Sequence, residues 1–167
     1  MTNITKGIRL LFPIKDMAHG EAVQVLLFAN RERSFESITF LHVVDKDLMG
    51  DPAYSAFEAI KRMRGHERSV ADSRAFLRDL VARTQRELDV ENVDFCVLSD
   101  HDVAGCILRK AEQLCSTMLI LLADNTSLQD NWFNTSVLKV VLRKTPDDLT
   151  VHVIKGPVRG GFLASLT

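Results

Sequence analysis

The sequence predicts an α/β fold: a doubly wound, five-stranded parallel sheet with helices on both faces. Short runs of branched and aromatic residues alternate with longer segments of helical periodicity along the chain. Strand, helix and strand follow one another within residues 8–44, which predicts parallel strands joined by a right-handed crossover. Residues 117–123 are almost entirely apolar, as in a strand covered by helices on both faces. We expect one domain over residues 1–167, with its core at about 7–155 and a C-terminal tail at 156–167.

The first strand, helix and strand are predicted from the spacing of apolar residues. Residues 8–14 are a short apolar run, and Pro13 suits a strand end because proline has no N–H to donate. The polar run 30–34 ends the following helix, and residues 37–44 form the second strand. The helix has apolar residues at helical spacing: Ala22, Val25, Leu26 and Ala29.

The middle of the chain begins with a weak pattern over residues 46–65, which predicts a loop. A short helical piece is expected within it, through Phe57, Ile60 and Met63. A long charged helix follows, with one apolar stripe: Val70, Leu77, Leu80, Val81, Thr84 and Leu88. Residues 93–98 predict the third strand.

The second half continues the alternation. The next helix has Asp102, or Ser99 upstream, as its N-cap, and its predicted core face is Ala104, Ile107, Leu108, Ala111 and Leu114. Residues 117–123 are the fourth strand, and a polar loop at about 124–133 leads to a last helix. That helix is predicted to direct inward Val137, Val140 and Val141. Residues 149–154 supply the fifth strand.

Composition and charge exclude several classes of function. The 21 basic and 22 acidic residues balance, so no net field favours nucleic acid or a membrane surface. Arginines are frequent in the long helix, but acidic residues interleave with them, which predicts a solvated face. No apolar run reaches the length of a membrane span, and the N-terminal one is too short for a secretory signal. We expect a soluble cytoplasmic protein with no nucleic-acid partner and no direct membrane insertion.

The reactive residues do not predict a catalytic or metal site. Three cysteines lie in apolar segments without a CxxC pair, which indicates small buried hydrophobes: Cys96, Cys106 and Cys115. Residues 99–102 (SDHD) are better explained by helix capping than by an acid/base pair or metal ligands. His42 and His152 lie within apolar strands and are interpreted as satisfied core or interface histidines. Without a nucleophile elbow, Walker loop or HExxH motif, we expect no enzyme and no metal.

Three local patterns resemble a known family. Residues 11–14 (LFPI) match a proline-containing first strand, and residues 40–45 (FLHVVD) match the end of a second strand. Residues 134–137 (NTSV) and 151–154 (VHVI) match a final helix and last strand. Together with the order of elements, these residues resemble the universal stress protein family. That resemblance implies a doubly wound five-stranded fold over nearly the whole chain.

The resemblance also implies where a ligand would bind. In nucleotide-binding members, a loop of the form G-x2-G-x9-G-[S/T] after strand four wraps the phosphates and ribose of ATP. With Ser136 as the final hydroxyl residue, non-glycine residues stand at all three glycine positions, and Lys15 stands where the family has an adenine-side acid. We therefore expect ATP binding in the usual mode to be impaired or lost, and no cofactor. The candidate ligand-binding residues are Pro13, Lys15, Val43, Leu122, Asn125, Thr135, Ser136 and Val137.

Partners and alternatives follow from the same resemblance. The family commonly pairs through its last strand, which predicts a homodimer edge containing Val151 and Val153. The function expected is a binding or regulatory module acting through dimerisation and through protein or small-ligand contacts. Three alternatives stay open: an ATP-binding universal stress protein, the cytoplasmic regulatory domain of a membrane transporter and, as the weakest, a nucleotide hydrolase. A small anion near Asn134 and Thr135 is a further alternative to simple helix capping.

Overall fold

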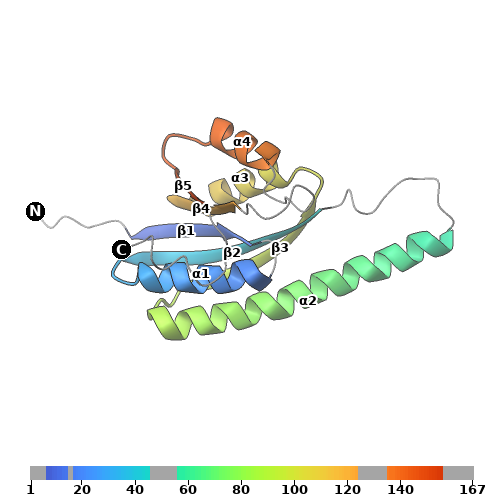
Figure 1. The fold of residues 1–167 in the computed structure, drawn as a ribbon, viewed down its shortest axis with the longest axis horizontal. Coiled ribbons are helices and arrows are strands. Elements are labelled where there is room, and N and C mark those ends of the chain that lie inside the picture. Colours follow the sequence, from blue (N-terminus) through green and yellow to red (C-terminus); the bar gives the residue numbers. More distant parts are fainter. Residues whose placement is uncertain (1–6, 15–16, 46–55, 124–134, 156–167) are drawn as a thin grey trace, which may run out of the picture.

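The computed structural model describes residues 7–14, 17–45, 56–123 and 135–155, in which strands and helices alternate (Figure 1). The five strands lie in one parallel sheet, in the order β3-β2-β1-β4-β5, so the predicted fold class is confirmed. The elements are β1 (Ile8–Pro13), α1 (Met17–Ala29), β2 (Phe35–Asp45), α2 (Ala56–Leu88), β3 (Val93–Asp100), α3 (Val103–Gln113), β4 (Met118–Ala123), α4 (Thr135–Lys144) and β5 (Thr150–Lys155).

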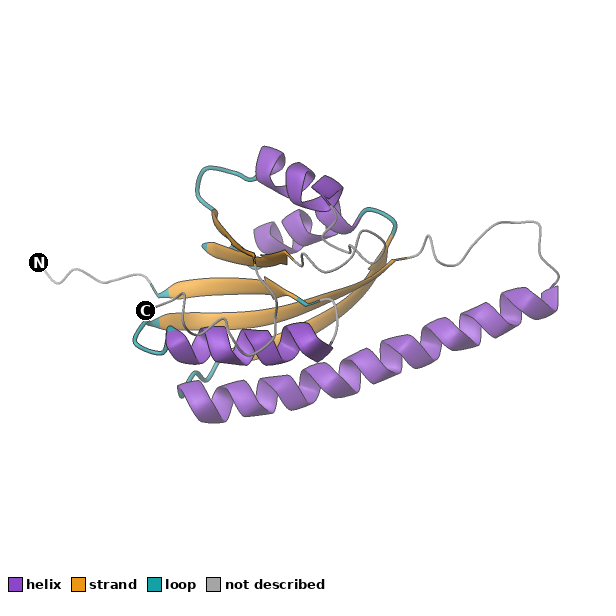
Figure 2. Cartoon of the chain, viewed as in Figure 1, coloured by secondary structure: helices purple, strands orange, loops and turns teal. Residues whose placement is uncertain are grey.

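The sheet separates two hydrophobic cores. Helices α1 and α2 cover one face and α3 and α4 cover the other (Figure 2). Successive side chains of a strand point to opposite faces. In β4, Leu119 and Leu121 therefore join the core under α3 and α4, whereas Ile120 and Leu122 join the core under α1 and α2. This double burial explains why the segment is apolar throughout.

Helix α1 follows the prediction in part: Leu26 is buried as predicted and Ala29 is not, while the side chains of Ala22 and Val25 lie outside the described residues. Val23 and Leu27 are also buried. The residues of this helix are apolar on nearly every side, so spacing alone does not select the inward face. Phe28 is 51% exposed, and the Arg31 guanidinium carbon lies 4.6 Å from the centre of its ring, in a cation–π arrangement.

Helix α2 is longer than predicted. It runs unbroken for 33 residues from Ala56 to Leu88. The helical piece expected through Phe57, Ile60 and Met63 is confirmed as helix but is part of α2, and the loop expected around it is wrong over residues 56–65. Residues 46–55 lie outside the described residues. Gly65 does not interrupt the helix, because a glycine costs a helix interior only about 1 kcal/mol relative to alanine. The predicted stripe is confirmed further along, with Leu77, Leu80 and Thr84 buried.

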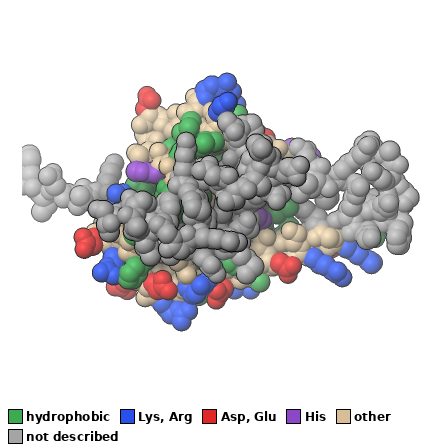
Figure 3. Space-filling model, in the orientation of Figure 1, with side chains coloured by type: hydrophobic (Ala, Val, Ile, Leu, Met, Phe, Trp, Pro, Cys, Tyr) green, Lys and Arg blue, Asp and Glu red, His purple; other side chains and the backbone are tan. Residues whose placement is uncertain are grey.

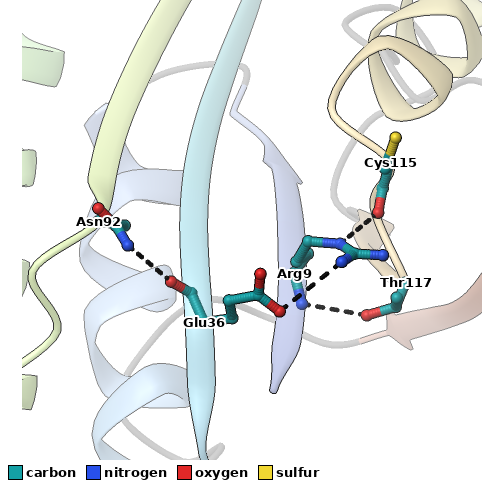
Figure 4. A network of polar contacts seen from close by, with 5 residues as sticks. All are labelled: Arg9, Glu36, Asn92, Cys115 and Thr117. Carbon is teal, nitrogen blue, oxygen red and sulfur yellow. Dashed lines mark hydrogen bonds and ion pairs between the residues drawn. The ribbon is translucent and has the colours of Figure 1, made fainter. Parts of the chain in front are cut away.

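The N-terminal ends of the strands are joined by a polar network (Figure 4). The Arg9 guanidinium donates to the Cys115 carbonyl at 2.6 Å and lies 3.7 Å from the Glu36 carboxylate. The Arg9 backbone N–H donates to the Thr117 hydroxyl at 3.0 Å, and Asn92 donates to the Glu36 carbonyl at 3.3 Å. These contacts link β1 and β2 to the residues just before β3 and β4, at the end of the sheet opposite the carboxyl ends of the strands.

The cysteines and histidines follow the predictions only in part. Cys106 is buried and Cys96 half-buried, but Cys115 is exposed, which corrects its interpretation as a buried hydrophobe. Cys115 ends α3 with a φ of 49°, and that turn brings it to the surface. His42 is satisfied, with Nδ1 2.8 Å from the Ile14 carbonyl oxygen. His152, by contrast, is exposed on β5.

Candidate functional site

The strand order reverses between β1 and β4, because the chain builds β2 and β3 on one side of β1 and β4 and β5 on the other. In open α/β sheets, ligands bind in the crevice outside the carboxyl ends of the strands at this switch point. The residues implied by the family resemblance come from the ends of β1, β2 and β4 and the start of α4. The candidate site is therefore the β1–β4 switch point.

The β1–β4 ladder is short. Its pairs are Leu10 with Met118 and Leu11 with Leu119, although β1 continues to Pro13 and β4 continues to Ala123. Pro13 has no N–H to donate across the ladder. Within the described residues, the carboxyl ends of the two central strands are thus not paired with each other.

Beyond Pro13, the chain is held towards β2. The Ile14 N–H donates to the Leu41 carbonyl at 2.7 Å, and the Ile14 carbonyl oxygen is 2.8 Å from His42 Nδ1. Ile14 is also buried in the core under α1 and α2. These contacts hold the end of β1 against β2. Lys15, the next residue, lies outside the described residues.

Leu122 is part of the sheet and of the core. It pairs with Ile154 of β5, and the ladder continues to the pair of Ala123 with Lys155. Its side chain is 5% exposed and packs in the core under α1 and α2. At position 122 the backbone is therefore an extended strand. Asn125 lies outside the described residues.

The remaining candidate residues lie on the other face of the sheet. Val43 is buried under α3 and α4, and Val137 is half-buried against the same core. Thr135 and Ser136 form the start of α4, whose first backbone N–H groups have no partner within the helix. The structure thus brings Val43 and Val137 together and places Leu122 on the opposite face.

Polar residues at the carboxyl end of β3 cap a helix, as predicted. The Asp102 side chain accepts from the Gly105 N–H at 2.9 Å and so caps α3. Asp100 accepts from the Asp102 N–H at 3.0 Å and from the Arg109 guanidinium at 2.6 Å. Burial, and then the nearby Asp100 carboxylate, raises the pKa of the Cys106 thiol, which stays protonated. In the described part of the chain, no group of three or more His, Cys, Asp and Glu could hold a metal.

A second recess, which the sequence did not predict, lies between α2 and β3. Its volume is about 530 Å³, and it is lined by Glu67, Val70, Ala71, Arg74, Ala75, Arg78, Val97 and Ser99. The α2 residues among these lie on one flank of the helix, beside the buried stripe. The sequence pattern of these residues does not identify a binding site, because alanines and charged residues are also typical of a solvated helix face.

Solved structures resemble the chain over most of its length, although no protein-family model and no curated protein matches the sequence. The hypothetical protein PH0823 is 22% identical, with a TM-score of 0.62 over 90% of this chain and 96% of that one. A universal stress protein family member from Burkholderia pseudomallei is 18% identical, with a TM-score of 0.52 over 87% and 95%. A universal stress protein solved in complex with cAMP is 10% identical, with a TM-score of 0.54 over 90% and 98%.

The strand order, the helices on both faces and the open β1–β4 switch point define a doubly wound α/β protein. More particularly, the chain has the universal stress protein fold, as its sequence patterns predicted. At these identities the likeness is one of fold. Among the helices described, none is both long and apolar enough to cross a bilayer.

Proposed function

We propose that this chain is a non-catalytic universal-stress-type module that binds and regulates through dimerisation and through protein or small-ligand contacts. It does not bind ATP in the family's usual mode. The observation that carries this proposal is the sequence at the three positions where the resemblance expects phosphate-loop glycines, which are occupied by Leu122, Asn125 and Thr135. Side chains there oppose the close approach of backbone N–H groups to a phosphate chain.

The surroundings of Leu122 support the proposal. A phosphate loop needs a turn that exposes bare backbone, and glycine serves that turn because it adopts positive φ without strain. Leu122 is instead extended, paired with Ile154 and buried in the core. The strand therefore continues past the position of the first expected glycine.

Isothermal titration calorimetry with ATP tests the proposal. We expect the unmodified chain to show no micromolar binding of ATP. The double variant Asn125→Gly plus Thr135→Gly restores two glycines and leaves the core residue Leu122 in place, and we expect it to bind ATP at least about tenfold more tightly, a gain of about 1.4 kcal/mol. Micromolar ATP binding by the unmodified chain, lost on changing Asn125 and Thr135, would contradict the proposal.

The matched control places glycine in the same loop outside the motif. The double variant Ser127→Gly plus Gln129→Gly adds the same number of glycines, so ATP affinity should not increase. An equal gain in that control would show that loop freedom, and not the motif positions, limits binding. Steady release of phosphate from ATP by the unmodified chain would contradict the non-catalytic part of the proposal.

Nucleotides with a single phosphate are a second candidate class. A structure of similar fold was solved in complex with cAMP. A cyclic monophosphate needs a much shorter anion cradle than a triphosphate, so the missing glycines weigh less against it. Titration with cAMP and AMP, in parallel with ATP, tests this second class. Saturable binding of cAMP without binding of ATP would favour it.

The homodimer of the proposal is supported by the backbone of β5. The Thr150 N–H donates to the Thr117 carbonyl of the neighbouring segment at 3.1 Å. Alternate residues of a strand direct their N–H and C=O groups to opposite sides, so those of Val151 and Val153 point to the open edge. Among the strands that the structure describes, β5 pairs only with β4, and its other edge would be the one to pair with a second copy.

Multi-angle light scattering tests this edge. We expect the unmodified chain to have twice its 18.8 kDa mass. Val153→Pro removes an N–H on the open edge while leaving the β4 ladder intact, and it should shift the protein to monomer. Val153→Thr keeps that N–H and is the control, which should remain dimeric. A monomeric unmodified chain at high concentration would contradict this part of the proposal.

A further inference from the structure

We propose that the groove between α2 and β3 binds a small organic anion, meaning one phosphate or carboxylate group carried on an apolar body. The groove is separate from the switch point, because β3 is an edge strand and β2 lies between it and β1. Its volume of about 530 Å³ falls within the range of small-molecule sites, about 300–1,000 Å³. This site therefore goes beyond the function proposed for the β1–β4 crevice.

The floor of the groove is apolar. Val70 on α2 and Val97 on β3 are both half-buried, so each leaves part of its surface in the groove. Ala71 and Ala75 follow on the same flank of α2, and their short side chains leave room that larger residues would fill. An apolar ligand body would cover this floor and remove it from water.

Two arginines give the groove its charge preference. Arg74 and Arg78 lie one helical turn apart, and neither has a hydrogen-bond or ion-pair partner among the described residues. The neighbouring Asp79 does not neutralise them, because it pairs with Arg83 at 3.0 Å. Arg83 is also held by Gln24 of α1, at 3.0 Å. Arg83 is thus paired within the protein, whereas Arg74 and Arg78 have no such partner in the part of the chain that the structure describes.

The chemistry of these two side chains selects the ligand. Guanidinium groups match phosphate and carboxylate oxygens with paired N–H donors, and two like charges one turn apart repel until an anion lies between them. Glu67 lines the opposite end of the groove, two turns from Arg74, or about 10 Å along the helix axis. A hydroxyl or amine on the ligand would donate there, so the site orients its ligand from end to end.

Charges elsewhere on α2 argue against nucleic acid as the occupant. Acidic and basic side chains are interspersed along the side of the molecule formed by α1 and α2 (Figure 3). A surface that tracks a nucleic-acid backbone needs a continuous basic stripe. The basic pair Arg74 and Arg78 lies at the groove, and the volume of the groove suits one small anion.

Two-dimensional NMR of the full chain tests the proposal, with phenyl phosphate as the probe. We expect saturable shifts of the amides of Ala71, Ala75, Val97 and Ser99 at millimolar concentration. Benzoate has the same ring with a carboxylate, and the tighter of the two identifies the preferred anion. Benzyl alcohol, which has no charge, should bind at least about tenfold more weakly than either. Inorganic phosphate should also be at least tenfold weaker, and equal binding would overturn the role of the apolar floor.

Matched variants distinguish the groove from surface charge. The double variant Arg74→Gln plus Arg78→Gln should weaken phenyl phosphate at least tenfold. Arg68→Gln removes an exposed arginine of the same helix outside the groove and should change the affinity less than twofold. Ala71→Leu fills the groove without removing charge and should also abolish the shifts. No saturable shift, or an equal loss in Arg68→Gln, would overturn this inference without bearing on ATP or Asn125.

Discussion

The two halves of α2 are held helical by different forces. From Val70 onwards the helix buries Leu77, Leu80 and Thr84 against the sheet and α1. In the first half, Ile60 is 51% exposed, and the other side chains described there are also exposed. Figure 1 shows this half extending beyond the sheet. Packing stabilises one half, whereas the other relies on helix propensity and on propagation from its packed neighbour.

Leu80→Ala should produce the largest change. Leu80 is fully buried between α2 and the sheet, so its truncation removes apolar contacts and leaves a cavity. We expect a loss of about 2–5 kcal/mol in the free energy of unfolding, measured by urea denaturation. A loss below about 1 kcal/mol would show that the second half of α2 is not held by packing, and the contrast between the halves would fail.

Thr84→Val tests the packed half of α2 in a second way. Thr84 is 2% exposed, and its hydroxyl oxygen has no hydrogen-bond partner in the described part of the structure. A buried polar group without a partner costs about 1–3 kcal/mol, and valine replaces the hydroxyl with a methyl group of similar size. We expect the free energy of unfolding, measured by urea denaturation, to rise by about 1 kcal/mol. A clear destabilisation would indicate that the hydroxyl makes a hydrogen bond within the native protein.

Gly65→Ala addresses the exposed half. Apart from the glycine itself, its two chain neighbours and the nearby backbone of the same helix, nothing lies within 4 Å of the position that an added Cβ would occupy, so alanine meets no obstacle. Alanine is favoured over glycine in a helix interior by about 0.5–1 kcal/mol. We expect stability to increase by up to that amount, with slower amide hydrogen exchange around residue 65. Unchanged exchange there would show that helix propensity does not limit this half.

The same contrast explains how far the sequence predicted the fold. Strand β4 was predicted from its apolar run because both of its faces are buried, and the stripe containing Leu77 and Leu80 was predicted because only one face is buried. The start of α2 was predicted only as a short helical piece, and its continuity with the rest of the helix was missed, since an exposed helix needs no apolar periodicity. In α1, apolar residues surround the helix, so the pattern could not identify Ala29 as exposed.

The candidate sites, too, could be predicted only in part from the sequence. The doubly wound sheet, and the location of Pro13, Val43 and Leu122 towards the carboxyl ends of their strands, could be predicted, because parallel strands place their carboxyl ends along one side of a sheet. The side of the sheet that receives Leu122 depends on strand register, which becomes visible only in the pairing with β5. The α2–β3 groove could not be predicted, because it forms only when Ala71 and Ala75 of α2 pack beside Val97 of β3 in the folded protein.

Ile60→Ala should have the smallest effect and is the matched partner of Leu80→Ala. Ile60 already exposes half of its surface, and alanine is the better helix former, so lost contacts and gained propensity nearly cancel. We expect the free energy of unfolding to change by less than about 0.5 kcal/mol in urea denaturation. The measurement should be repeated at several protein concentrations. A loss above 1 kcal/mol that grows with concentration would contradict the contrast, because it would mean that a second copy buries the exposed half of α2.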